Sequence, residues 1–156
     1  MRAFTAPLDS LEEYGQIKER IKKNQGVLQV SGCIDSQKSH FMYSIGETYG
    51  QKLILTYSDL RAREIYENYR FFDRNVLIYP ARDLMFYNAD IQSHQIGMQR
   101  MMVQKSLMEE EDITVIATLP ACMERILPLT YMQEHVLEFQ NDSSLDLQKL
   151  SAQLVE

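Results

Sequence analysis

Short apolar runs alternate with amphipathic stretches along this chain, and that alternation restricts its fold more than any other feature. Residues 52–56, 75–79 and 113–118 are short runs dominated by Ile, Leu and Val. All three predict strands, and the runs 52–56 and 113–118 are typical of strands that are buried on both faces of a parallel sheet. A similar run at residues 26–30 predicts a first buried strand. We therefore expect an α/β fold, with a mainly parallel sheet and helices on both of its faces.

The segments between these runs have helical patterns. Ser10 and Glu13 have the spacing of a capping box and predict a helix over residues 10–23. Helices are also expected over residues 38–49 and 94–108. Between them, Ser58 and Asp59 cap a further predicted helix. Its core stripe is expected to consist of Leu60, Ala62, Ile65, Tyr66 and Tyr69.

The remaining segments are predicted more coarsely. Residues 81–93 have no clear periodicity and are interpreted as a connection, and a short helix is expected from Pro120 to Ile126. Residues 136–139 predict another strand, and a turn and a helix over 145–155 follow. No stop signal closes this last helical pattern, so we expect the chain to be a fragment of a longer polypeptide.

Composition narrows the class of protein. A chain of 156 residues with 45% hydrophobic residues suffices for one packed domain. No apolar run approaches the roughly 18 residues of a membrane span and no signal peptide is recognisable, so a cytoplasmic location is expected. The net charge of −6 argues against a chain whose main task is to hold nucleic acid. Cys33 and Cys122 lack metal-ligand spacing and are expected to be free thiols.

One motif points to chemistry. The segment from Gly32 to Ser39 fits the phosphate-binding consensus G-x-x-x-x-G-K-[ST], except that Gln37 replaces the second glycine. In that consensus, successive backbone N–H groups cradle phosphate oxygens, the lysine reaches the terminal phosphates and the hydroxyl holds magnesium. Gln37 crowds the place where the loop approaches a nucleotide. The candidate nucleotide-binding residues, regarded as vestigial, are Gly32, Ser36, Gln37, Lys38 and Ser39.

The other parts of a catalytic site are missing from the sequence. A working nucleotidase has an apolar strand that ends directly in an acidic residue, whereas the acidic run 109–112 precedes its strand and Asp83 follows the third strand only after three intervening residues. The three histidines, at positions 40, 94 and 135, lack metal-site spacing. We therefore expect no catalytic residue and no bound metal in this chain.

Several arginines are candidates for contact with DNA or a partner protein. They lie along the predicted helix after Ser58 and near the third strand, interleaved with Glu64 and Glu67. A solvated face is the alternative interpretation. The residues are Arg61, Arg63, Arg70 and Arg82, with Arg74 nearby.

Several motifs in sequence order resemble the N-terminal region of bacterial transcription-repair coupling factors. They are Val30 to Lys38, Leu53 to Thr56, Arg63 to Tyr66, Phe71-Phe72, Tyr79 to Asp83, Gln99-Arg100 and Val115 to Ala121. The resemblance covers roughly residues 8 to 140.

This resemblance implies a fold and a role. The family region is similar to the UvrB subunit of the excision-repair nuclease and keeps a RecA-like sheet, of the P-loop NTPase type, with a decayed nucleotide loop. It implies a UvrB-like domain 1a over residues 1–134 and the start of the UvrA-binding subdomain at 135–156. The tyrosine-rich DNA clamp of UvrB is expected to be absent, since residues 80–100 are short. The motor domains that use ATP and magnesium, and the module that binds RNA polymerase, lie outside this chain.

Two functional hypotheses follow. The first is a non-catalytic scaffold and interaction module in transcription-coupled repair, whose partners UvrA, RNA polymerase and DNA are engaged through the full-length protein. The second is a small P-loop enzyme, which Gly32, Lys38 and Ser39 would support. Loss of the second glycine and the lack of a second acidic motif favour the scaffold.

Overall fold

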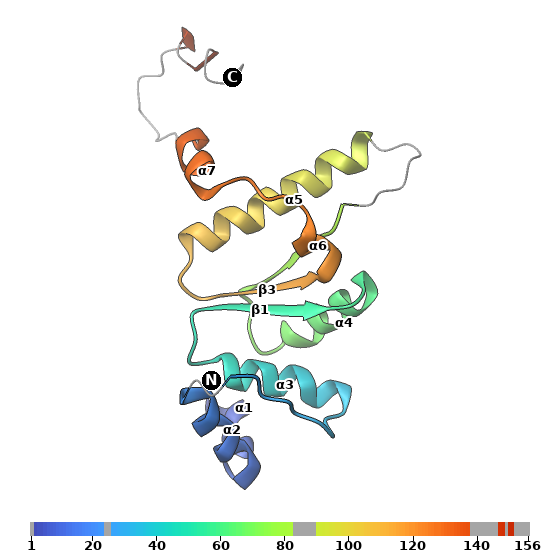
Figure 1. Ribbon diagram of the computed structural model, residues 1–156, viewed down its shortest axis with the longest axis vertical. Coiled ribbons are helices and arrows are strands. Elements are labelled where there is room, and N and C mark those ends of the chain that lie inside the picture. The colour runs from blue at the N-terminus through green and yellow to red at the C-terminus, as the bar shows by residue number, and fades with distance from the viewer. Residues whose placement is uncertain (1, 24–25, 83–89, 138–146, 149, 152–156) are drawn as a thin grey trace. The chain divides into compact units, whose positions relative to one another are not determined.

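The computed structural model describes residues 2–23, 26–82, 90–137, 147–148 and 150–151 of the chain. These residues divide into two compact units, 1–124 and 125–156. The first unit has an α/β fold, with a three-stranded, all-parallel sheet flanked by helices (Figure 1). The domain boundary at residue 134 that the family resemblance implies stays a prediction.

The sheet has the strand order β1-β3-β2. Its strands are β1 (Gln51–Thr56), β2 (Val76–Tyr79) and β3 (Ile113–Thr118). β3 is central, and its six residues are all buried. Leu53 and Leu77 both pair with Val115, which fixes the register on its two sides. The sequence therefore predicted these three strands correctly, within one residue at each end.

Helices cover both faces of the sheet (Figure 1). On one face, α3 (Asp35–Gly46) and α4 (Asp59–Tyr69) pack on the strands around Ile116 and Val76. On the other face, α5 (Asp90–Glu109) and α6 (Leu119–Met123) surround Val115, Ala117 and Tyr79. Two apolar clusters, one on each side of β3, thus form the core of this unit.

The prediction that residues 52–56 are buried on both faces was wrong. β1 lies at the edge of the sheet, and its residues alternate between exposed and half-buried. Ile54 packs under α3 and α4, whereas Leu53 is 60% exposed and Leu55 is 54% exposed. The apolar run 52–56 therefore predicted a strand correctly but did not predict that this strand lies at the edge of the sheet.

The predicted strand at residues 26–30 is not formed. Residues 27–31 carry no regular secondary structure, and the Val27 side chain is 97% exposed. The helix that follows begins at Asp35 instead of Lys38, so it takes up the second half of the predicted loop. Gly32 has φ of +85°, a left-handed conformation that a residue with a Cβ rarely adopts.

The N-terminal helices also differ from the prediction. The expected helix over residues 10–23 is α2 (Glu12–Lys22), and Leu11 is its N-cap residue. The capping box was wrong, because the Ser10 hydroxyl donates to the Pro7 carbonyl, at 2.7 Å. A helix that was not predicted, α1 (Arg2–Asp9), precedes it. The buried Tyr14 hydroxyl of α2 bonds to the Ser44 hydroxyl, which ties α2 to α3.

The later helices agree better with the sequence. Ser58 caps α4 by accepting a hydrogen bond from the Arg61 backbone N–H, at 3.2 Å. Ala62, Ile65 and Tyr69 are buried as expected, but Leu60 is 71% exposed. α5 begins four residues before the predicted start at 94, and residues 83–89 of the expected connection lie outside the described residues.

The second unit contains α7 (Leu129–His135), which was not predicted. Val136 and Leu137 carry no strand structure, and the rest of the predicted strand and turn lies outside the described residues. Residues 147, 148, 150 and 151 are helical, in agreement with the predicted last helix. In the described part of the chain, no helix is both long and apolar enough to cross a membrane.

Candidate phosphate-binding loop

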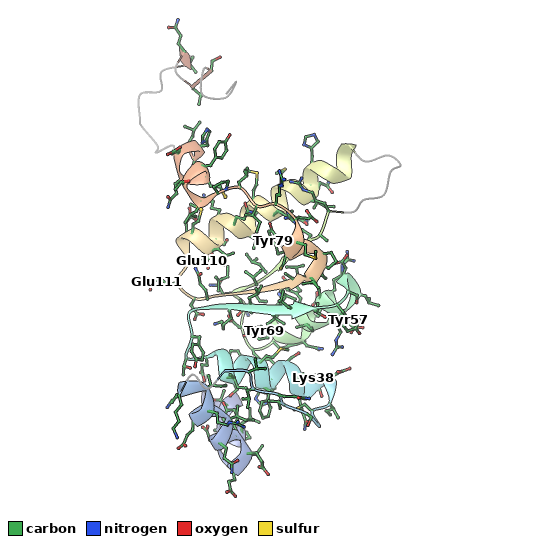
Figure 2. The ribbon with its side chains drawn as sticks, viewed as in Figure 1. Lys38, Tyr57, Tyr69, Tyr79, Glu110 and Glu111 are labelled. Carbon is green, nitrogen blue, oxygen red and sulfur yellow. The ribbon has the colours of Figure 1, made fainter. Side chains whose placement is uncertain are left out.

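The segment with the phosphate-binding consensus lies near the carboxyl end of β1. Figure 2 shows Lys38 at the same end of the first unit as Tyr57, which directly follows β1. The carboxyl ends of parallel strands are where open α/β sheets bind ligands. The predicted residues are thus placed where a ligand site is expected for this class of fold.

Two backbone N–H groups of this segment, those of Ile34 and Lys38, donate hydrogen bonds within the chain. The Lys38 N–H donates to the Ile34 carbonyl, at 3.0 Å, as part of the first turn of α3. The Ile34 N–H donates to the side-chain oxygen of Gln37, at 3.2 Å. Isoleucine offers no side-chain acceptor in return, so only one half of a capping box is present. Gln37 therefore acts as a local cap, and these two N–H groups are not available to phosphate oxygens.

A carboxylate of the chain itself neutralises the cations beside the loop. The Lys38 ammonium donates to Asp35 Oδ1, at 2.9 Å, and one Arg61 guanidinium nitrogen donates to the same oxygen, at 2.8 Å. Arg61 also pairs with Glu64, at 2.8 Å. These contacts hold the pKa of the Asp35 carboxyl below its usual value, first through the hydrogen bond from Lys38 and then through the charge of Arg61. Two cations that could attract a phosphate thus share an internal anion.

A cavity of about 550 Å³ lies beside these groups. Gly32, Lys38, Ser39 and Arg61 line it together with apolar side chains of α3, β1 and α4. Ser39 is only 2% exposed, whereas the side chain of Lys38 is 52% exposed. Ser36 and Gln37 are exposed on the first turn of α3 and do not line the cavity. The structure therefore brings three of the five predicted residues, Gly32, Lys38 and Ser39, to one cavity.

A nucleotide with magnesium would require contacts other than those that these residues make here. Its phosphates would need free N–H groups, a free lysine and a hydroxyl directed at the metal. Instead, the helix starts early, Lys38 is bound by Asp35, and Ser39 is buried in the wall.

The acidic run 109–112 lies at the opposite end of the sheet, where the strands begin. Figure 2 shows Glu110 and Glu111 at the end of the sheet away from Lys38. Asp112 pairs with Lys52 at 2.6 Å, and Glu110 accepts from the Asn75 amide at 2.6 Å. The run lies at the amino ends of the strands, as its position before residues 113–118 predicted, but these acids were interpreted as solvated turn residues, and two of them instead bond to Lys52 and Asn75. Asp83 lies outside the described residues.

The histidines and cysteines form no candidate metal centre in the described residues. Among these residues, no group of three or more His, Cys, Asp or Glu side chains could hold a metal ion. The His40 ring stacks on Phe72, and the His135 ring stacks on Tyr131. His94 is exposed on α5, and Cys33 and Cys122 are free thiols.

The arginines predicted to contact DNA or a partner lie in three places. Arg61 belongs to the network around Asp35. Arg63 and Arg82 line one groove, and Arg70 and Arg74 line another. Both grooves run beside α4 and β2, and Tyr66 and Leu77 line both of them. Four of the predicted arginines thus line adjoining grooves, Arg61 is paired elsewhere, and contact with DNA or a partner stays a prediction.

Sequence reasoning missed the roles of Asp35 and Arg100. Asp35 precedes Lys38 by three residues, which is the spacing of a helical ion pair, but the helix was expected to begin only at Lys38. Arg100 is 3% exposed and donates to the Pro80 carbonyl, at 2.8 Å. It also pairs with Glu124 at 3.1 Å and stacks over the Tyr79 ring. Arg100 thereby joins the carboxyl ends of β2 and β3, and no periodicity signalled that it would be buried.

Comparison of this chain with family models, curated proteins and solved structures gave no match.

Proposed function

We propose that this chain is the non-catalytic, UvrB-like N-terminal module of a transcription-repair coupling factor. In this proposal it supports recruitment of UvrA and restrains the motor domains located elsewhere in the full-length protein. The ordered motifs between residues 8 and 140 motivate it. The all-parallel sheet agrees with a RecA-like domain, and its three strands are the expected runs at residues 52–56, 75–79 and 113–118.

The ion pair between Asp35 and Lys38 is the observation that carries the non-catalytic part of the proposal. The Asp35 carboxylate lies where it satisfies both Lys38 and Arg61, so a phosphate would have to displace it. Gln37 uses its side chain to cap α3 at the position where the consensus has glycine. The one departure from the consensus, Gln37, thus caps the helix, while Asp35, at a position where the consensus allows any residue, pairs with both cations.

Calorimetric titration with ATP and magnesium tests this part of the proposal. We expect no measurable heat of binding and no hydrolysis by the 156-residue chain. A dissociation constant in the micromolar range would contradict a non-catalytic module.

A pull-down with purified UvrA tests the partner. This chain and a version extended through the next subdomain of the parent protein would be compared. Binding by the longer version alone would assign residues 1–134 a supporting role. If neither version bound UvrA, the proposed link to repair coupling would be wrong, whatever the result with ATP.

A small P-loop enzyme is the second candidate function. The cavity beside Lys38 and Ser39, together with the left-handed Gly32, favours it. In that case Lys38→Ala should abolish both nucleotide binding and turnover. An unchanged melting temperature of the unsubstituted chain on addition of ATP and magnesium would count against this alternative.

A further inference from the structure

A continuous surface along α4 and β2 combines arginines with one exposed aromatic ring, Phe71, and one half-buried ring, Tyr66. One groove, of about 470 Å³, is lined by Arg63 and Arg82 at the end of β2. A second groove, of about 660 Å³, is lined by Arg70, Phe71 and Arg74. Tyr66 and Leu77 line both, so the two grooves adjoin. We call this surface the arginine-aromatic groove; it follows α4, drawn in green in Figure 1.

The charge of this groove is opposite to that of the chain. Four arginines and two acidic residues, Asp59 and Glu67, line it, which leaves a net charge of +2. The whole chain has a net charge of −6. Among the described residues, no carboxylate pairs with Arg63, Arg70 or Arg74, whereas Arg82 lies 3.8 Å from Glu124. Three of the four guanidinium groups are therefore available to an anionic partner.

The aromatic side chains determine which anionic partner fits. Phe71 is 81% exposed, so this ring, which lines the groove together with Arg70 and Arg74, contributes little to the core. The neighbouring Tyr66 ring lies 5.7 Å from the Arg70 guanidinium carbon, so that cation and ring already form one surface. Flat rings beside guanidinium groups bind unstacked bases, while the guanidinium groups neutralise the phosphates. Duplex DNA keeps its bases stacked and could use only the arginines.

We infer that the arginine-aromatic groove binds single-stranded nucleic acid without sequence preference. Phe71 supplies a stacking platform for a base. Arg70 and Arg74 on one side, and Arg63 on the other, contact the phosphates. This activity is separate from the proposed scaffold role, since it requires neither UvrA nor the loop at Gly32.

Fluorescence anisotropy with a labelled 12-nucleotide oligothymidine tests the inference on the 156-residue chain. We expect binding at low salt that weakens as salt rises, with a log–log slope of about −2 to −3 for three to four phosphate contacts. Phe71→Ala should weaken binding about tenfold at an unchanged slope, because stacking depends little on salt. Phe71→Leu should weaken it similarly, and Phe71→Tyr should retain it.

Substitution of Arg70 and Arg74 should change the salt dependence of binding. The double substitution Arg70→Ala and Arg74→Ala should make the slope shallower by about 1.4, since each phosphate contact to a single strand contributes about 0.7. Arg20→Ala and Tyr57→Ala are matched controls, because both residues are exposed and lie outside the groove. These controls should leave affinity and slope unchanged.

Three results would overturn the inference. The first is no binding of the oligothymidine at low salt. The second is equal losses in the Phe71 variants and the two controls. The third is tighter binding of a duplex or of a polyglutamate peptide of matched charge, which would assign the groove to those partners.

Discussion

The Lys38 ammonium lies 2.9 Å from the Asp35 carboxylate, one turn earlier in α3. The same carboxylate oxygen accepts a hydrogen bond from Arg61, at 2.8 Å. Asp35 therefore pairs with both Lys38, in the loop, and Arg61, in α4. Since the exposed fraction of its side chain is 62%, solvent screens these ion pairs, and their effect is on ligand access more than on stability.

This relationship predicts that restoring the missing glycine is not sufficient for nucleotide binding. Gln37→Gly removes a side chain but leaves Lys38 and Arg61 paired with Asp35, so we expect no measurable binding of ATP with magnesium by calorimetry. Binding should be sought in the double variant Asp35→Ala and Gln37→Gly, in which both cations are free. Detectable affinity in the Gln37→Gly variant alone would show that the glycine was the only element lost.

The pKa of the Asp35 carboxyl provides a test of the ion pair in solution. Lys38 and Arg61 lower this pKa from its usual 3.8, so the ionised form is favoured in the folded state. The resulting stabilisation is present above pH 3.8 and is lost as the pH falls through the lowered pKa. Carboxyl ¹³C chemical shifts should show the lowered pKa, and Lys38→Ala should raise it toward the usual value. An identical Asp35 titration in both proteins would refute the contact.

The positions of β1 and β3 predict very different costs for removing an aliphatic side chain. Ile116 in β3 is fully buried between the helices, so Ile116→Ala should lower the free energy of unfolding by about 2–5 kcal/mol. Leu53 in β1 is 60% exposed, so Leu53→Ala should change it by no more than about 0.5 kcal/mol. Urea denaturation of both variants measures the difference. A comparable loss in both would mean that β1 is covered in solution.

The sequence predicted the type of most elements because their signals are local. Ser58 caps α4, and the run 113–118 is fully buried in β3, as the pattern indicated. The position of β1 at the edge could not be predicted, because a run such as residues 52–56 is the same whether one or two strands pair with it. Ser10 has the spacing of a capping box, yet its hydroxyl finds the Pro7 carbonyl of the unpredicted α1.

The candidate site was predicted only in part for a related reason. The consensus specified where Gly32, Lys38 and Ser39 would lie, and they do line one cavity. It could not reveal that α3 starts at Asp35 and that the Gln37 side chain accepts a hydrogen bond from the Ile34 N–H at that start. Arg61 was expected to contact DNA or a partner or to lie on a solvated face, but it pairs with Asp35, which is 26 residues earlier in the sequence. Such a contact is set by packing of α3 against α4, not by local pattern.

Gly50 and Gly97 allow a matched test of packing, because a Cβ would meet the Glu111 backbone at position 50 and open space at position 97. Gly50 lies directly against the Glu111 backbone carbonyl, so a Cβ at position 50 would overlap that oxygen. Backbone atoms cannot move aside as a flexible side chain can, and Gly50→Ala should therefore destabilise the fold by about 1–3 kcal/mol. Gly97 has open space around its Cβ position within α5, so Gly97→Ala should instead stabilise it by up to about 1 kcal/mol. Thermal melts of the two variants should move in opposite directions. A higher melting temperature for Gly50→Ala would mean that the turn before β1 does not approach residue 111 in solution.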